Sequence, residues 1–365
     1  MTPAGRHGTR CGVDFVWREG VHVVESGLWC DAPRAHDLCF LSSAQAFLTS
    51  ERSAWQRSAL LCSEKTWRFC QALDGRAQAR SLLLSPTGRP FQLGTLRLEL
   101  FASGGVSGAS SLWLRLPSGR TVAYAGAPNP RADFSRAAGG EPMQVRSAET
   151  LVCNAPLASL AQSLPSLEEA AARLRDLIAE GQAAATVSVL LCPPLTMARP
   201  IVEILGSTGL HAHPQILRAV HASQLLDPSS STLPKLVRHA RALRGGQVLL
   251  WPLSTVNELP RLAQLLHADA GGARFFLCSG LGLLPEVAAA CRAALDAIGH
   301  ELSAILPFPD VMDRQGLIDY VAATEARQLY LTTGFSETLA SLLRRDRKRV
   351  AVSPLGPPSQ LVLLP

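Results

Sequence analysis

The stretch Asp37–Ser50 reads DLCFLSSAQAFLTS, an apolar segment followed by small polar residues. The run from Leu38 to Leu41 is typical of the end of a buried strand, and Ser42, Ser43 and Gln45 mark a turn behind it. Taken alone, the stretch predicts one strand and one turn. Its meaning depends on the elements that surround it in the chain.

The composition predicts a globular chain with more than one hydrophobic core. Hydrophobic residues make up 47% of the 365 residues and charged residues only 18%, which suits two lobes or one domain with a large insertion. The net charge of +6 is mild evidence for a polyanionic partner. The nine cysteines lie mostly in apolar runs, so we expect buried, reduced thiols and a cytoplasmic location. No run of 18 apolar residues is present, and no membrane span is expected.

The pattern of apolar residues predicts an α/β protein. Short strands begin the chain, residues 80–126 have the pattern of strands separated by turns, and strands alternate with helices from residue 186 onward. Residues 128–147 are rich in Pro, Gly and Ala and predict a loop. A helix is expected over Arg199–Leu205, with Pro200 in its first turn.

Two motifs that could bind ligands have simpler structural interpretations. The segment SGGVSGASS (103–111) resembles a phosphate loop, but a strand pattern follows it instead of a helix, which favours a turn between strands. His211 and His213 form an HxH motif that is followed by Pro214, with no acidic partner nearby in the sequence. A surface loop is therefore favoured over a metal site.

Four segments, in this order along the chain, carry a resemblance to a known family. They are GLWCDAPRAHDLCFLSSAQ (27–45), VAYAGA (122–127), the DxxDxxGL element that begins at Asp310, and LYLTTGFSETLASLLRR (329–345). With the order of the predicted elements, they resemble the β-CASP branch of the metallo-β-lactamase superfamily, and most of all its mRNA 3′-end processing factor-like and DNA-ligase-associated exonuclease-like proteins. The resemblance implies a four-layer αββα metallo-β-lactamase sandwich formed by residues 1–160 and 301–365. A parallel α/β β-CASP domain, residues 161–300, is inserted between these two parts.

Members of this family bind two zinc ions and cut phosphodiester bonds in RNA or DNA, with His and Asp ligands drawn from loops at strand ends. In this chain every one of those ligand positions is occupied by a different type of residue. The positions are Ser43, Gln45, Phe47 and Leu48 (family HxHxDH), Gly105 (the His of the Gly-rich turn), Ala127 (the bridging Asp), Asn154 (the next acid), Val311 (the His of SDHxD) and Thr333 (the last His).

These side chains offer zinc either no donor atom or a weak neutral oxygen. The resemblance therefore implies a degenerate site without a metal or any other cofactor, in which Phe47 and Leu48 fill the space of the ions. Three acids of the family pattern persist, namely Asp31, Asp310 and Asp313. The turn glycines Gly104 and Gly108 persist as well.

The leading hypothesis is a catalytically inactive pseudonuclease that serves as a structural or regulatory partner in RNA processing or DNA repair. Its expected partner is an active paralogue or another nucleic-acid-processing protein, with RNA or DNA contact in the cleft between the lobes. A basic cluster near the C-terminus predicts either nucleic-acid contact or, more simply, a solvated helix end that complements the helix dipole. It consists of Arg344, Arg345, Arg347, Lys348 and Arg349.

Two alternatives remain open. The first is a nuclease with a relocated site in which carboxylates hold magnesium, built from Asp31, His36, Asp37, Asp310 or Asp313. The second is a plain nucleic-acid-binding module, whose affinity would fall steeply with salt.

Overall fold

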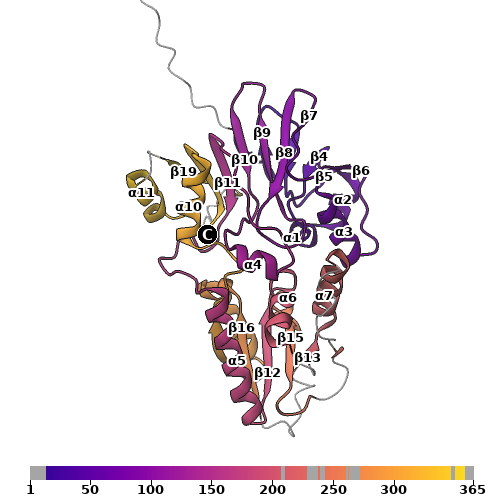
Figure 1. The fold of residues 1–365 in the computed structure, drawn as a ribbon, viewed down its shortest axis with the longest axis vertical. Coiled ribbons are helices and arrows are strands. Elements are labelled where there is room, and N and C mark those ends of the chain that lie inside the picture. Colours follow the sequence, from indigo (N-terminus) through magenta and orange to yellow (C-terminus); the bar gives the residue numbers. More distant parts are fainter. Residues whose placement is uncertain are drawn as a thin grey trace, which may run out of the picture.

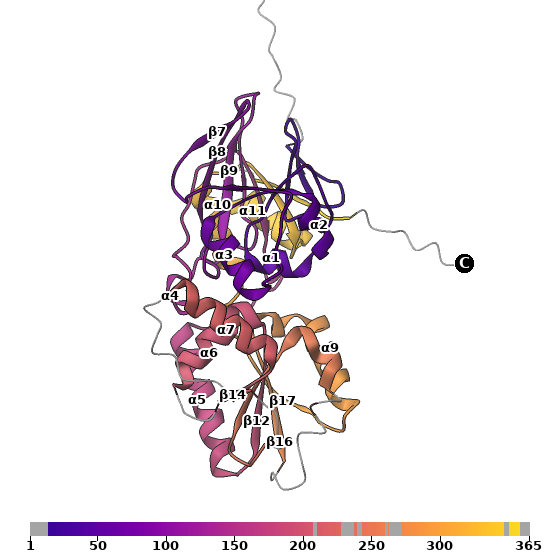
Figure 2. The same ribbon diagram turned by 90° about the vertical axis from the view of Figure 1, so that its right-hand side faces the viewer.

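The protein has an α/β fold with three sheets arranged in two lobes (Figures 1 and 2). The computed structural model describes residues 14–206, 210–227, 237–238, 243–259, 262, 272–346 and 350–357. We call the two mixed sheets and the helices on them the sandwich lobe. The third sheet and its helices form the parallel lobe, which lies below the sandwich lobe in Figure 1.

The first sheet of the sandwich lobe has six strands in sequence order. Its first three strands are antiparallel, and from the third strand onward all neighbours are parallel. The strands are β1 (Phe15–Trp17), β2 (Val21–Val23), β3 (Leu28–Cys30), β4 (Leu38–Phe40), β5 (Ala59–Cys62) and β6 (Ser81–Leu84).

The second sheet has seven strands in the order β19-β18-β11-β10-β9-β8-β7. Its neighbours are parallel from β19 to β10 and antiparallel from β10 to β7. The strands are β7 (Phe91–Leu93), β8 (Leu96–Ala102), β9 (Ser110–Arg115), β10 (Thr121–Tyr124), β11 (Thr150–Asn154), β18 (Gln328–Thr333) and β19 (Ala351–Pro354).

The two sheets of the sandwich lobe pack face to face because their strands alternate between apolar and polar residues. In β8, Leu96, Leu98 and Leu100 are buried, while Arg97 between them is exposed. These leucines share one core with residues of the first sheet such as Phe15 and Phe40.

Helices cover the outer faces of both sheets. On the first sheet lie α1 (Ala44–Thr49), α2 (Arg52–Arg57) and α3 (Glu64–Leu73), which share a core with the outward side chains of β4 and β5. On the second sheet lie α10 (Arg314–Thr324) and α11 (Glu337–Asp346).

The parallel lobe contains one fully parallel sheet with helices on both faces. All six residues of its central strand β12 are buried, as expected of a strand that is covered on both sides. The strand order is β14-β13-β15-β12-β16-β17, with β12 (Val187–Cys192), β13 (Leu210–Ala212), β14 (Val237–Arg238), β15 (Val248–Pro252), β16 (Ala273–Cys278) and β17 (Leu302–Leu306). Within the described residues, its helical elements are α5 (Leu167–Ala183), α6 (Pro194–Leu205), α7 (Pro214–Leu226), η2 (Leu253–Glu258), η3 (Gly280–Leu283) and α9 (Pro285–Asp296).

The structure corrects two local predictions in which tertiary contacts override the local pattern. The expected loop at 128–147 contains the short helix α4 (Ala132–Ala137), whose Phe134 packs into the core of the parallel lobe. His211 lies in β13, where pairing with β14 and β15 supplies the backbone partners, and His213 caps α7. The expected surface loop at the HxH motif is therefore wrong.

A third correction concerns α6, which begins at Pro194 and not at Arg199. Proline suits the first position of a helix because its missing N–H has no intrahelical partner there. Pro200 thus lies inside the helix. The eight described cysteines are all buried and form no disulfides, as the sequence predicts, and Cys11 lies outside the described residues. No described helix is both long and apolar enough to cross a bilayer.

Asn129 links three loops at the junction of the lobes. Its buried side chain donates a hydrogen bond to Pro309 O (2.8 Å) and accepts one from Arg131 N–H (3.0 Å). Its backbone N–H donates to Ser103 O (2.9 Å). The loop after β10, the Gly-rich turn after β8 and the loop before α10 are therefore held at one residue.

We expect Asn129→Ala to destabilise the protein by roughly 1–3 kcal/mol, because it leaves a buried carbonyl and a backbone N–H without partners. Urea denaturation measures this change in the free energy of unfolding. Asn154→Ala, at a half-buried asparagine of the same lobe, is the matched control. Equal, small effects of the two substitutions would show that the Asn129 side chain does not hold the junction.

Candidate functional site

The carboxyl ends of four strands meet at the edge of the sandwich lobe that faces the parallel lobe. Asn154, at the end of β11, donates its N–H to Gly126 O (2.7 Å), and its side-chain oxygen accepts a hydrogen bond from the Thr333 hydroxyl at the end of β18. A Cβ atom on Gly126 would lie 2.8 Å from the Ser42 hydroxyl oxygen. Of the sequence-predicted positions, Asn154 and Thr333 are therefore in contact, and Ser43 and Ala127 directly follow the contacting residues Ser42 and Gly126.

Asp31 holds the strand ends at this edge together by hydrogen bonds. Its carboxylate accepts hydrogen bonds from the backbone N–H of Ser42 (2.8 Å), from the Ser42 hydroxyl and from the Tyr124 hydroxyl (3.0 Å). Burial raises the pKa of Asp31 above its usual value, and these hydrogen bonds oppose that rise. The retained Asp31 thus joins the ends of β3, β4 and β10, and its oxygens are engaged within the fold.

The Gly-rich turn is a tightly packed connection between β8 and β9, as the sequence predicts. Gly104 has φ +79°, and a Cβ atom there would lie 1.9 Å from Asn129 O. Gly108 has φ +77°, and a Cβ atom there would lie 2.4 Å from Thr66 N. These two positions therefore require glycine for packing. Gly105 between them is half-buried and carries no donor group.

The side chains of Phe47 and Leu48, both in α1, point in different directions. Phe47 is 5% exposed and lies in the core on the outer face of the first sheet, with its ring 5.9 Å from that of Trp55 and 6.4 Å from that of Trp67. Leu48 is 51% exposed. Successive residues of a helix point about 100° apart, so only one of the two can face the core. The expectation that both fill one former ion site is wrong.

Asp310 is bound to the parallel lobe. Its two carboxylate oxygens accept hydrogen bonds from the Ser279 hydroxyl (2.6 Å) and from the Gly280 N–H (2.7 Å). Burial raises its pKa to about 6, although these hydrogen bonds favour the charged form. The next residue, Val311, is half-buried, and its side chain approaches Gly280. Asp310, in the loop after β17, is therefore hydrogen-bonded to the loop after β16.

Asp313 has a comparable structural role. It caps α10 by accepting the Gly316 N–H (2.8 Å) and also accepts the Leu164 N–H (3.1 Å) from the loop before α5. Arg131 lies 3.5 Å from the same carboxylate. Both retained acids of the DxxD element thus hold the chain where it passes between the lobes.

The residues of the alternative magnesium site are not brought together. His36 stacks on Trp29 with ring centres 4.3 Å apart, and exposed Asp37 pairs with Arg80 at 3.4 Å. Within the described residues, no three His, Cys, Asp or Glu side chains are placed to share one metal ion. The two zinc ions that members of the resembled family bind also do not fit the strand-end site, because its side chains are hydroxyl, amide and methyl groups.

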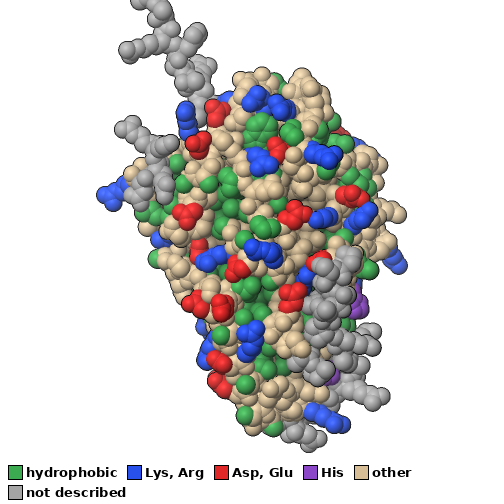
Figure 3. All heavy atoms as spheres, in the orientation of Figure 1, with side chains coloured by type: hydrophobic (Ala, Val, Ile, Leu, Met, Phe, Trp, Pro, Cys, Tyr) green, Lys and Arg blue, Asp and Glu red, His purple; other side chains and the backbone are tan. Residues whose placement is uncertain are grey.

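The basic cluster lies only partly within the described residues. Arg344 and Arg345 are exposed in the last turn of α11, where their charges complement the helix dipole. This helix lies on the outer side of the sandwich lobe, away from α6 and α7 (Figure 1). On the face drawn in Figure 3, basic side chains alternate with acidic ones over both lobes. Arg347, Lys348 and Arg349 lie outside the described residues.

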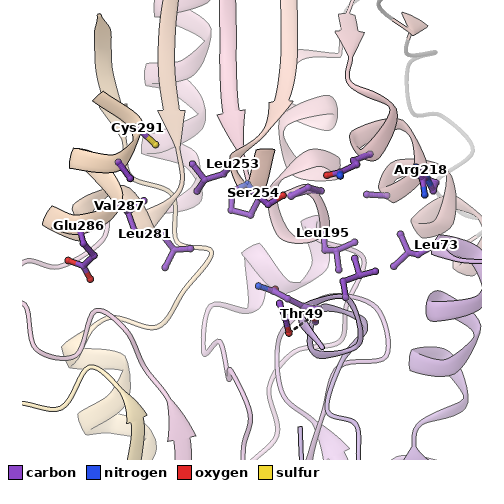
Figure 4. Close-up of a pocket in the computed structure, with 17 residues that line it drawn as sticks. Thr49, Leu73, Leu195, Arg218, Leu253, Ser254, Leu281, Glu286, Val287 and Cys291 are labelled. Atoms are coloured by element: carbon purple, nitrogen blue, oxygen red, sulfur yellow. Dashed lines mark hydrogen bonds between the residues drawn. The ribbon is translucent and has the colours of Figure 1, made fainter. Parts of the chain in front are cut away.

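A cavity of about 680 Å³ lies between the lobes (Figure 4), and the sequence reasoning missed most of its residues. Its lining includes Gln45, Leu48 and Thr49 of α1 together with residues that directly follow β12, β15 and β16. The available signal was the end of each apolar strand in the third sheet, for example CPP and WPL. Ligand sites of parallel sheets form outside such carboxyl ends.

We expect Phe47→Ala to cost about 3–5 kcal/mol, because it removes a buried ring between two tryptophans. Leu48→Ala should stay within about 0.5 kcal/mol of the wild type, because its side chain is exposed. Chemical denaturation of the two variants measures the difference. Similar losses of stability for both variants would contradict the finding that Phe47 is buried in the core and Leu48 is exposed.

The raised pKa of Asp310 predicts a pH-dependent stability. A proton binds more tightly to the folded than to the unfolded carboxyl, so this contribution is full below about pH 4 and is lost as the pH rises through about 6. Asp310→Asn keeps an acceptor for Gly280 and a partner for Ser279 but cannot titrate. The stability of the wild type relative to this variant should fall by about 2–3 kcal/mol between about pH 4 and pH 7. Parallel stability curves would show that Asp310 does not titrate in this way.

Comparisons with known proteins add information on the fold. No protein-family model matches the sequence, and no curated protein matches it. Among solved structures, the chain is similar to a protein of unknown function from Enterococcus faecalis V583, with a TM-score of 0.54 and 13% sequence identity. The similarity covers 88% of this chain and 79% of that chain. At this identity the comparison supports a shared α/β fold that extends over most of the chain.

Proposed function

We propose that this chain is a non-catalytic relative of the β-CASP metallo-β-lactamase nucleases. In this proposal, the two helix-covered sheets correspond to the αββα sandwich and the parallel lobe to the inserted β-CASP domain. The path of the chain supports this correspondence. It leaves the second sheet after β11, builds the parallel lobe, and returns through α10 to place β18 beside β11.

One observation carries the proposal. The ends of β4, β10, β11 and β18, where the family would position ligands, lie at one edge of the sandwich lobe, and the Ser43 hydroxyl there caps α1. The Thr333 hydroxyl bonds to the Asn154 side chain, and Ala127 beside them has only a methyl group. A two-metal phosphodiesterase needs several anionic or imidazole ligands at this place. We therefore derive no hydrolytic step for this chain.

The retained acids support the same conclusion. Asp31, Asp310 and Asp313 each accept at least two hydrogen bonds from neighbouring segments. Using them as magnesium ligands would require these bonds to break, which disfavours a relocated metal site. These hydrogen bonds, which hold neighbouring segments together, explain how the acids can persist without a metal.

The biological role that follows is that of a structural or regulatory partner in nucleic-acid processing. An active paralogue, or another protein of such a pathway, would supply the chemistry, and RNA or DNA could be held without being cut. The exposed Arg344 and Arg345 offer phosphate contacts on the sandwich lobe. A plain nucleic-acid-binding module is the second candidate, and the net charge of +6 is the observation that favours it.

Metal content and nuclease activity test the proposal together. Elemental analysis of the purified protein should find zinc and manganese well below one ion per chain. Labelled single-stranded RNA and DNA should stay intact when zinc, manganese or magnesium is added. A stoichiometric metal ion together with metal-dependent cleavage would overturn the proposal.

A further inference from the structure

We propose that the cavity between the lobes is a binding site for a small apolar acid, that is, a hydrocarbon chain with a single anionic group at one end. This inference does not depend on the proposed function. Its first support is position. The cavity lies outside the carboxyl ends of the neighbouring parallel strands β15, β12 and β16. The chain connections that lead from β12 towards β13 and β14 contain α6 and α7, which pack on one face of the sheet. The connections that lead towards β16 and β17 contain η2 and α9, which pack on the opposite face. Parallel sheets bind ligands at such a reversal.

The second support is size and surface chemistry. A volume of about 680 Å³ lies within the range of small-molecule sites. The lining between its ends is mainly apolar and includes Leu48, Leu195 and Leu253. Leu48 is half exposed although it is a large aliphatic side chain. An apolar surface of this kind, gathered in a concave site, is typical of a ligand site.

The third support is the charge at the two ends. Figure 4 shows Arg218 of α7 at one side of the cavity and Glu286 of α9 at the other, with Leu253 and Ser254 between them. Gln215 lies one turn before Arg218 on the same face of α7 and adds an amide. A guanidinium with a neighbouring amide binds a carboxylate well.

Helix dipoles fix the direction of the ligand. The N-termini of α6 and α7 adjoin the cavity, and neither helix has an acidic residue in its first turn. The N-terminus of α9 already has an acid in its first turn, Glu286 itself. Negative charge is favoured at the first two helix ends and disfavoured beside Glu286. The anionic group therefore lies at Arg218, and the hydrocarbon chain extends past Leu195 and Leu253 towards Val287.

Isothermal titration calorimetry with three probes that share a linear chain of ten carbons tests this arrangement on the full chain. Decanoate should bind with a stoichiometry of one. Decyltrimethylammonium, which reverses the charge, should bind at least about tenfold more weakly. Decanedioate should also bind more weakly, because its second carboxylate meets Glu286, and Glu286→Gln should recover part of that loss.

Two variants separate the site from non-specific binding. Arg218→Gln and Leu48→Asp change exposed side chains, so both proteins should fold, and circular dichroism checks that they do. Each should weaken decanoate binding by about tenfold or more. Arg173→Gln, an exposed arginine on α5 outside the cavity, is the matched control and should bind like the wild type. The proposal is overturned if decanoate does not saturate, if Arg218→Gln binds it as well as the wild type, or if the cationic probe binds equally well.

Discussion

The structure depends on the place where the chain crosses twice between the lobes. The outgoing segment after β11 and the returning segment before α10 lie side by side, with Leu157 bridged to Asp313. The Arg314 side chain donates to Ala158 O (3.0 Å) and to Ser159 O. These bonds join residues more than 150 positions apart. Because they fix the returning segment, β18 can enter the second sheet beside β11, and the sandwich lobe can close after the parallel lobe has been inserted.

This junction also explains the chemistry of the retained acids. A carboxylate has two oxygens with several acceptor sites, so it can bind backbone donors from two segments at once. Asp313 does so with the N–H groups of Leu164 and Gly316. Asp310 instead binds the Ser279 hydroxyl and the Gly280 N–H, which both lie in the loop after β16. An aliphatic residue would leave those buried donors unsatisfied. The buried acids of this junction are therefore accounted for by the donors that they bind.

Much of this fold could be predicted from local sequence, because alternation and turn chemistry are local. The leucines of β8 and the glycines at 104 and 108 gave correct expectations. Features set by distant partners could not be predicted. His211 is in a strand because β14 and β15 flank it. Phe134 lies in the short helix α4, which packs against the core of the parallel lobe. The cavity was missed for the same reason, since its walls come from segments that are far apart in the chain.

The stretch Asp37–Ser50 shows how one loop can contribute to both lobes. Its strand pairs within the first sheet, and Ser43 caps the helix that follows. One face of that helix places Phe47 between two tryptophans, so the helix is held firmly by the sandwich core. The other face then has a fixed position, and it directs Gln45 and Leu48 towards the parallel lobe. In the proposed family these two positions would carry imidazoles. With an amide and an isobutyl group instead, the same rigid support gives the cavity an apolar wall, so the core that holds α1 in place also sets the chemistry of the cavity.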